Sequence, residues 1–187
     1  MVRELRISPG QTLHVEVQEV RWERKNEEIL ILESTVVDTP LLSWLRKPLR
    51  WEGQAKVKML NLVSADQAFA HGKWQMRGVA SGWLRMRVSG ARTEELTLSL
   101  EAHPPGGSLS REALERILSL VPKEDLREVL LAAIKMKDSF DYRVGRLGVV
   151  TEKENYAFYV YLDGDHLLDV TVRVPKEGIG LLADLLP

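Results

Sequence analysis

Alternating apolar and polar positions predict long β-strands in the first hundred residues. Leu13, Val15 and Val17 alternate with polar neighbours, which is the pattern of a strand with one buried face. The alternation changes phase at Glu19, where we expect a β-bulge or bend. A polar turn at residues 24–28 should follow, and then strands at 29–37, 55–59, 73–80, 83–90 and 94–102.

Two short segments between these strands carry helical signals. Residues 40–47 gather leucine and tryptophan on one side of a short helix, which the following proline would end. Residues 64–71 predict a second short helix, with a capping box between Ser64 and Gln67 and a closing Gly72.

The second half of the chain begins with a break at residues 103–108, which hold two prolines and two glycines. An apolar stripe then predicts a helix at 109–121, and Pro122 would open a second helix after it. Strands follow at 140–151, 156–162 and 167–174, with a hairpin turn at 163–165 and a short closing helix at 179–186.

This order of elements predicts a single α+β domain over residues 1–187. We expect an extended antiparallel sheet with a strand-rich first hundred residues, a central helical pair and a C-terminal three-stranded segment. An alternative division separates a β-rich basic part, 1–102, from a part with the helical pair and a β-hairpin, 109–187.

Composition narrows the class of protein. A hydrophobic fraction of 44% and a charged fraction of 28% are ordinary for a globular protein. We find no apolar run long enough to cross a bilayer and no signal-peptide pattern, so we expect a cytoplasmic protein that can lie peripheral to the membrane. With 0 cysteines the chain forms no disulfide, thiolate zinc site or cysteine nucleophile. Scarce asparagine, with charge carried largely by Glu and Arg, resembles a thermophile-like composition.

Positive charge is concentrated in one segment, residues 44–92. It holds ten Lys or Arg and two acids, Glu52 and Asp66, so its net charge is 10 − 2 = +8, against −1 for the whole chain. The same segment holds four of the 5 tryptophans. Basic residues interleaved with tryptophan suit an anionic partner that has an apolar component.

Two groups of residues are candidates for binding such a partner. The first is a cationic sheet face formed by Lys56, Lys58, Arg77, Arg85 and Arg87, each opposed along its strand by apolar residues. The alternative is an ordinary solvated face whose cations pair with acids from elsewhere. The second group is a short interfacial segment with Trp44, Arg46, Lys47, Arg50 and Trp51, and its alternative is a helix that caps the core.

Catalytic and metal-binding motifs are lacking. The 4 histidines are scattered at no ligand spacing, and the serines lie in no nucleophile elbow. A hairpin turn accounts for Asp163, Asp165, His166 and Asp169 more simply than an acidic site does. We therefore expect a non-enzymatic protein without a cofactor.

Residues 38–70 resemble one segment of the bacterial LmeA-like lipid-binding family, whose architecture is related to the tubular (TULIP-like) lipid-binding domains. The resemblance is carried by Asp38-Thr-Pro-Leu-Leu-Ser-Trp-Leu45 with Leu49, Ala55, Val57, Asp66, Ala68 and Phe69, and more loosely by the helix that begins at Leu109. It implies an elongated α+β fold with an apolar groove for acyl chains, and no catalytic residues.

The function that we expect is binding of an anionic amphiphile, lipid or membrane surface through the basic, tryptophan-containing face. The alternatives are binding of single-stranded nucleic acid, which is the less favoured partner, and a protein-interaction or assembly role, including a homo-oligomer.

Overall fold

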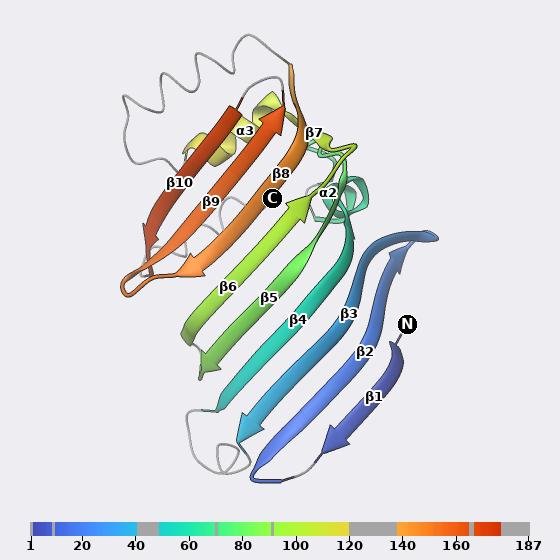
Figure 1. Cartoon of the computed structure of the whole chain (residues 1–187), viewed down its shortest axis with the longest axis vertical. Coiled ribbons are helices and arrows are strands. Elements are labelled where there is room, and N and C mark those ends of the chain that lie inside the picture. Colours follow the sequence, from blue (N-terminus) through green and yellow to red (C-terminus); the bar gives the residue numbers. More distant parts are fainter. Residues whose placement is uncertain are drawn as a thin grey trace.

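A single antiparallel sheet dominates the computed structural model (Figure 1), which describes residues 2–8, 10–40, 49–69, 71–90, 92–119, 138–164 and 167–176. Its strands are β1 Val2–Ser8, β2 Thr12–Arg24, β3 Glu27–Pro40, β4 Arg50–Asn61, β5 Val79–Ser89, β6 Arg92–Ala102, β7 Gly107–Ser110, β8 Ser139–Thr151, β9 Asn155–Gly164 and β10 Leu167–Pro175. The described helices are α2 Leu62–Phe69 and α3 Arg111–Ser119. The described part is thus mostly antiparallel sheet with few helices, in broad agreement with the expected α+β class.

Strand order in the sheet follows chain order, β1-β2-β3-β4-β5-β6-β8-β9-β10, and β7 pairs with the beginning of β8. Because β6 pairs with β8, the sheet continues across the break at residues 103–108. The two parts of the alternative division therefore share one hydrogen-bonded sheet.

The sequence correctly located the irregularities of the first hairpin. Glu19 has a left-handed φ of 51°, which marks the bend expected in β2. Lys25 and Asn26 have φ values of 52° and 65°, which fit the two-residue turn whose twist matches that of paired strands. Asparagine tolerates this left-handed region better than most residues, so the polar turn at 24–28 forms here.

Strand pairing sorts the side chains onto two faces, because residues opposite each other in an antiparallel ladder point the same way. One face, called the apolar face below, contains three rows of paired residues that cross the sheet. They are Leu5–Val17–Thr35–Ala55–Leu84–Leu98–Val149–Phe158–Val172, Ile7–Val15–Val37–Gly53–Met86–Leu96 and Val57–Gly82–Leu100–Leu147–Val160–Val170.

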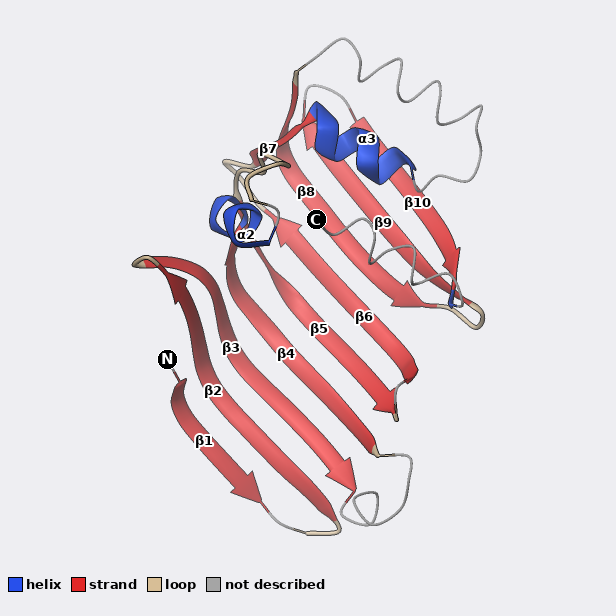
Figure 2. Ribbon diagram, turned by 180° about the vertical axis from the view of Figure 1, so that it is seen from behind, coloured by secondary structure: helices blue, strands red, loops and turns tan. Residues whose placement is uncertain are grey.

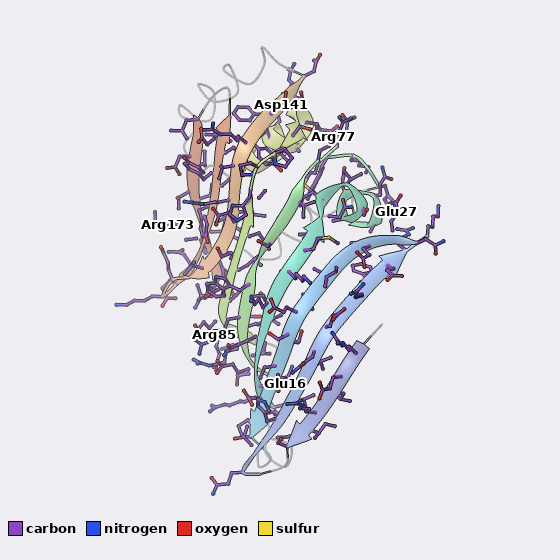
Figure 3. The ribbon with its side chains drawn as sticks, turned by 45° about the vertical axis from the view of Figure 1, so that its right-hand side comes forward. Glu16, Glu27, Arg77, Arg85, Asp141 and Arg173 are labelled. Atoms are coloured by element: carbon purple, nitrogen blue, oxygen red, sulfur yellow. The ribbon has the colours of Figure 1, made fainter. Side chains whose placement is uncertain are left out.

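The opposite face, called the polar face, is rich in charged and hydroxyl groups. One of its rows is Arg6–Glu16–Val36–Gln54–Arg85–Thr97–Val150–Ala157–Arg173, and Figure 3 labels Glu16, Arg85 and Arg173 of this row. The sheet is therefore amphipathic along its whole width.

Helix α3 covers only one end of the apolar face. It lies against β8–β10, in front of these strands in Figure 2. Its Leu114 belongs to a buried cluster with Val160, Leu162, Val170 and Val172 of β9 and β10. Helix α2 packs instead beside β3 and β4, at the end where Ile29 and Ile31 of β3 are buried.

Helix α2 begins differently from the prediction. The side chain of Asn61 accepts hydrogen bonds from the backbone N–H groups of Val63 (3.1 Å) and Ser64 (3.2 Å), so Asn61 is the N-cap. The predicted capping box of Ser64 and Gln67 is wrong, since Ser64 already lies inside the helix. Gly72 follows the helix with a φ of 75°, as its proposed role in closing the helix requires.

Other expected elements were misplaced or lie outside the described residues. The predicted strand at 73–80 is wrong up to residue 78, because the backbone before β5 is irregular and Arg77 forms only an isolated bridge with Ser108; Val79 and Ala80 begin β5. The helix predicted at 109–121 is present as α3 from Arg111 to Ser119, but Leu109 and Ser110 belong to strand β7, and residues 120–121 lie outside the described part. Three predicted helices lie outside the described residues: the short helix at 40–47 beyond Pro40, the helix opened by Pro122 and the closing helix at 179–186. The same holds for Asp165 and His166 of the last hairpin turn.

Candidate functional site

The cations predicted on two neighbouring strands do share one face. Strands β4 and β5 pair with Lys56 opposite Trp83 and Glu52 opposite Arg87, so Lys56, Trp83, Arg85 and Arg87 all lie on the polar face. Trp83 is 45% exposed. The strand periodicity therefore predicted this arrangement correctly.

Each of these cations has an acidic partner. Glu52 accepts hydrogen bonds from Arg85 (Nε, 2.9 Å; Nη2, 2.7 Å) and from Arg87 (3.3 Å). Arg87 also pairs with Glu95 on β6 (3.2 Å), and Lys56 pairs with Glu33 on β3 (2.7 Å). The alternative of a solvated, charge-paired face thus describes these three residues well.

The electrostatics of the Glu52 cluster follow from these contacts. Hydrogen bonds from Arg85, and secondarily from Arg87, lower the pKa of Glu52, although partial burial opposes them. The same hydrogen bond, with the negative charge of Glu52, raises the pKa of Arg85. The cluster therefore stays ionised and internally compensated near neutral pH.

Similar pairs continue along the polar face. His14 on β2 contacts Asp38 on β3 (Nδ1 to Oδ1, 2.7 Å), and Arg146 on β8 donates to Glu101 on β6 (3.1 Å). Arg146 also lies 5.7 Å from the ring centre of Tyr161 on β9. Opposite charges meet across strands over most of this face, which leaves little net potential for an anion.

Arg77 lies away from this face, contrary to its predicted place on a cationic strand. Its backbone N–H and C=O bond to Ser108 (2.9 and 3.2 Å), and its carbonyl also accepts the hydroxyl of Tyr142 (2.9 Å). Burial raises the pKa of the Tyr142 phenol, which keeps it protonated as the donor. Lys58 falls where the register of β4 and β5 shifts, beyond the paired rows, and its side chain is exposed.

The interfacial segment is described in part. Trp44, Arg46 and Lys47 lie outside the described residues. Trp51 lies on the apolar face opposite Val88, with its ring over Gly53, so it is not part of the polar face. Arg50 is exposed at the beginning of β4.

Arg50 has a basic neighbour that the sequence prediction did not single out. Ser89 pairs with Arg50 on one side and with Arg92 on the other, so two arginines flank one serine at this margin of the sheet. We call Arg50, Trp51 and Arg92 the basic margin. Both arginines lie within the basic segment 44–92, but only the pairing of β4, β5 and β6 brings them together.

Other kinds of site are not evident in the described part of the chain. There, no group of three His, Cys, Asp or Glu residues could hold a metal ion. No described helix is long and apolar enough to cross a membrane. An open depression of about 840 Å³ lies beside the β2–β3 hairpin, but Glu23, Glu27 and Glu28 line it, which disfavours an anionic ligand.

No family model, curated protein or solved structure matches this chain. Its function must therefore be argued from the two faces and the margin described above.

Proposed function

We propose that the protein binds an anionic amphiphile without catalysis, with the acyl chain on the apolar face and the headgroup at the basic margin. The observation that carries the proposal is that, among the described residues, the apolar face is much longer than the part of it that a helix covers. One apolar row crosses nine strands, whereas α3 lies against the last three, and its buried cluster reaches no further than Ala80 and Ala102 at the ends of β5 and β6 that are nearest to it.

The exposure of side chains along one apolar row increases away from α3, which supports the proposal. Val172 on β10 is 3% exposed beneath α3, whereas Leu5 at the other end of the row is 57% exposed. The intervening residues on β2 to β6, Val17, Thr35, Ala55, Leu84 and Leu98, are half-buried. Apolar surface of this extent is typical of a site for an apolar ligand or partner.

The basic margin supplies the polar end of the proposed site. Trp51 lies on the apolar face at the beginning of β4, whereas the exposed Arg50 and its neighbour Arg92 lie on the polar-face side, so an anionic headgroup would reach them around the ends of the strands. Tryptophan and arginine together suit the boundary between acyl chain and anionic headgroup. The proposal thus keeps the expected class of ligand, and the LmeA-like resemblance is compatible with it. It differs from the sequence-based expectation in placing the acyl chain of the ligand on the apolar face of the sheet instead of the basic face.

Two substitutions on the same strand test the assignment, because their side chains point to opposite faces. Met86→Glu introduces a carboxylate on the apolar face, and Arg85→Gln is the matched change on the polar face. With dansyl-labelled undecanoic acid as the probe, we expect saturable binding with blue-shifted emission. Burying an unpaired carboxylate costs several kcal/mol, so Met86→Glu should weaken binding by about tenfold or more and Arg85→Gln should change it little.

Circular dichroism of both variants controls for folding. Native mass spectrometry of the purified protein would show whether a lipid accompanies it. The proposal fails if the wild-type protein shows no saturable binding, or if Arg85→Gln weakens binding as much as Met86→Glu does.

Single-stranded nucleic acid is the second candidate ligand, and one observation supports it. The exposed Trp83 lies in a polar-face row with Ser99, Gly148 and Tyr159, so two rings flank two small residues. Aromatic side chains on an open sheet can stack with bases. An oligonucleotide that binds in a salt-sensitive way, and loses affinity on Trp83→Ala while Met86→Glu has no effect, would favour this candidate.

A further inference from the structure

Strand β1 forms one free edge of the sheet. It pairs with β2 on one side, and no described element continues the sheet on its other side (Figure 1). An unpaired edge presents backbone N–H and C=O groups that can pair with another strand. Three large apolar side chains of β1 are more than half exposed, Val2 (55%), Leu5 (57%) and Ile7 (59%).

The opposite edge, β10, is different. Its Leu168, Val170 and Val172 are already buried in the cluster with α3, and the strand ends at Pro175, which has no N–H to donate. Apart from Leu167 at its beginning (67% exposed), the apolar side chains of β10 would gain little further burial from an added strand. The exposed apolar edge in the described part of the sheet is therefore β1.

The sequence of β1 is complementary to itself in one antiparallel register. With Leu5 opposite Leu5 of a second copy, Glu4 lies opposite Arg6 on the polar face and Arg3 lies opposite Ile7 on the apolar face. Moving the centre to Glu4 or to Arg6 would set like charges against each other. A shift by one residue would oppose the apolar face of one copy to the polar face of the other.

We propose that two copies of this chain associate through antiparallel pairing of their β1 strands, with Leu5 on the two-fold axis. Glu4 and Arg6 already contact each other along the strand (2.6 Å), with both side chains well exposed. In the dimer, the side chains of Glu4 and Arg6 would turn toward the second copy, and their contact within one strand would be replaced by two Glu4–Arg6 pairs between the strands. The two-fold axis is perpendicular to the sheet, so the apolar faces of the two copies continue into each other.

Charge exchange tests the register. Sedimentation velocity over a range of protein concentrations should show a monomer–dimer equilibrium for the wild-type protein. Arg6→Glu sets two glutamate pairs across the axis and should raise the dimer dissociation constant by about tenfold or more. The double variant Glu4→Arg/Arg6→Glu restores opposite charges and should restore the dimer, which a general loss of folding would not allow.

Cysteine cross-linking tests the axis, and the chain has 0 native cysteines to interfere. Leu5→Cys should form a disulfide-linked dimer under mild oxidation, since directly opposed residues have Cα atoms about 5 Å apart. Val2→Cys on the same strand should not, because its two copies would lie about 20 Å apart. A wild-type protein that stays monomeric at all concentrations, or equal cross-linking of the two variants, would overturn the proposal.

Discussion

Asp66 fixes the segment that joins α2 to β5, and its removal gives the sharpest stability prediction. The side chain is 3% exposed, and its two oxygens accept the backbone N–H groups of Trp74 and Met76, each at 3.2 Å. The Asp66 carbonyl also accepts the N–H of Gly72 (3.1 Å). One buried residue thus folds back the whole segment of 71–77.

The expected cost follows from these two side-chain bonds. A hydrogen bond to a charged acceptor contributes about 1.5–3 kcal/mol, so Asp66→Ala should lower the free energy of unfolding by about 3–6 kcal/mol. Asp66→Asn keeps one acceptor oxygen and should lose about half of that amount. Since native domains have about 5–15 kcal/mol of stability in total, the alanine variant should be close to unfolding.

Urea unfolding followed by circular dichroism measures these values, provided that the dependence on urea is the same in all variants. Asp169→Ala on the exposed side of β10 is a matched control, for which we expect a change within about 0.5 kcal/mol. A loss below about 1 kcal/mol for Asp66→Ala would refute the anchoring role, as would equal losses for Asp66→Ala and Asp169→Ala.

Two further predictions concern the faces of the sheet. Arg85 lowers the pKa of Glu52, so this pair stabilises the fold above the pKa of about 4.3 of the unfolded chain, and the stabilisation is lost as the pH falls through the folded pKa. Glu52→Gln should therefore lower the melting temperature at pH 7, and this effect should shrink steadily as the pH is lowered into the acid range. An effect that does not depend on pH would contradict the ion-pair account. The hydroxyl of Thr35, which lies in an apolar row, is buried without a hydrogen-bond partner. Thr35→Val should therefore raise the free energy of unfolding, measured by urea titration, by about 1 kcal/mol. A lower free energy of unfolding would show that the hydroxyl has a partner in solution.

The strands were predictable because alternation is a local property of the chain. The pattern around Leu84 and Arg85 assigned their faces correctly, and the phase change at Glu19 located the bend. The failures arose where a neighbour decides the outcome. Residues 73–77 alternate like a strand, but Asp66 takes two of their N–H groups and leaves the segment irregular.

The basic segment shows why the candidate site was only partly predictable. Counting charge along the chain gave +8 for residues 44–92, yet two of the compensating acids, Glu33 and Glu95, lie on strands outside that window. Strand pairing brings them to Lys56 and Arg87. The extent of the apolar face was equally hidden, since alternation predicts an apolar side for each strand but not which strands a helix covers.

Strand order has a consequence for how the chain is made. From β1 to β6 each strand pairs with the one synthesised just before it, so this part of the sheet can form strand by strand, with α2 in the connection between β4 and β5. Helix α3 begins only at Arg111, after all six strands. At about 5–20 residues per second, the ribosome leaves the apolar side of the nascent sheet exposed for seconds. During that interval a chaperone that recognises apolar strands can bind the nascent sheet, and less apolar surface is accessible to it once α3 packs onto β8–β10.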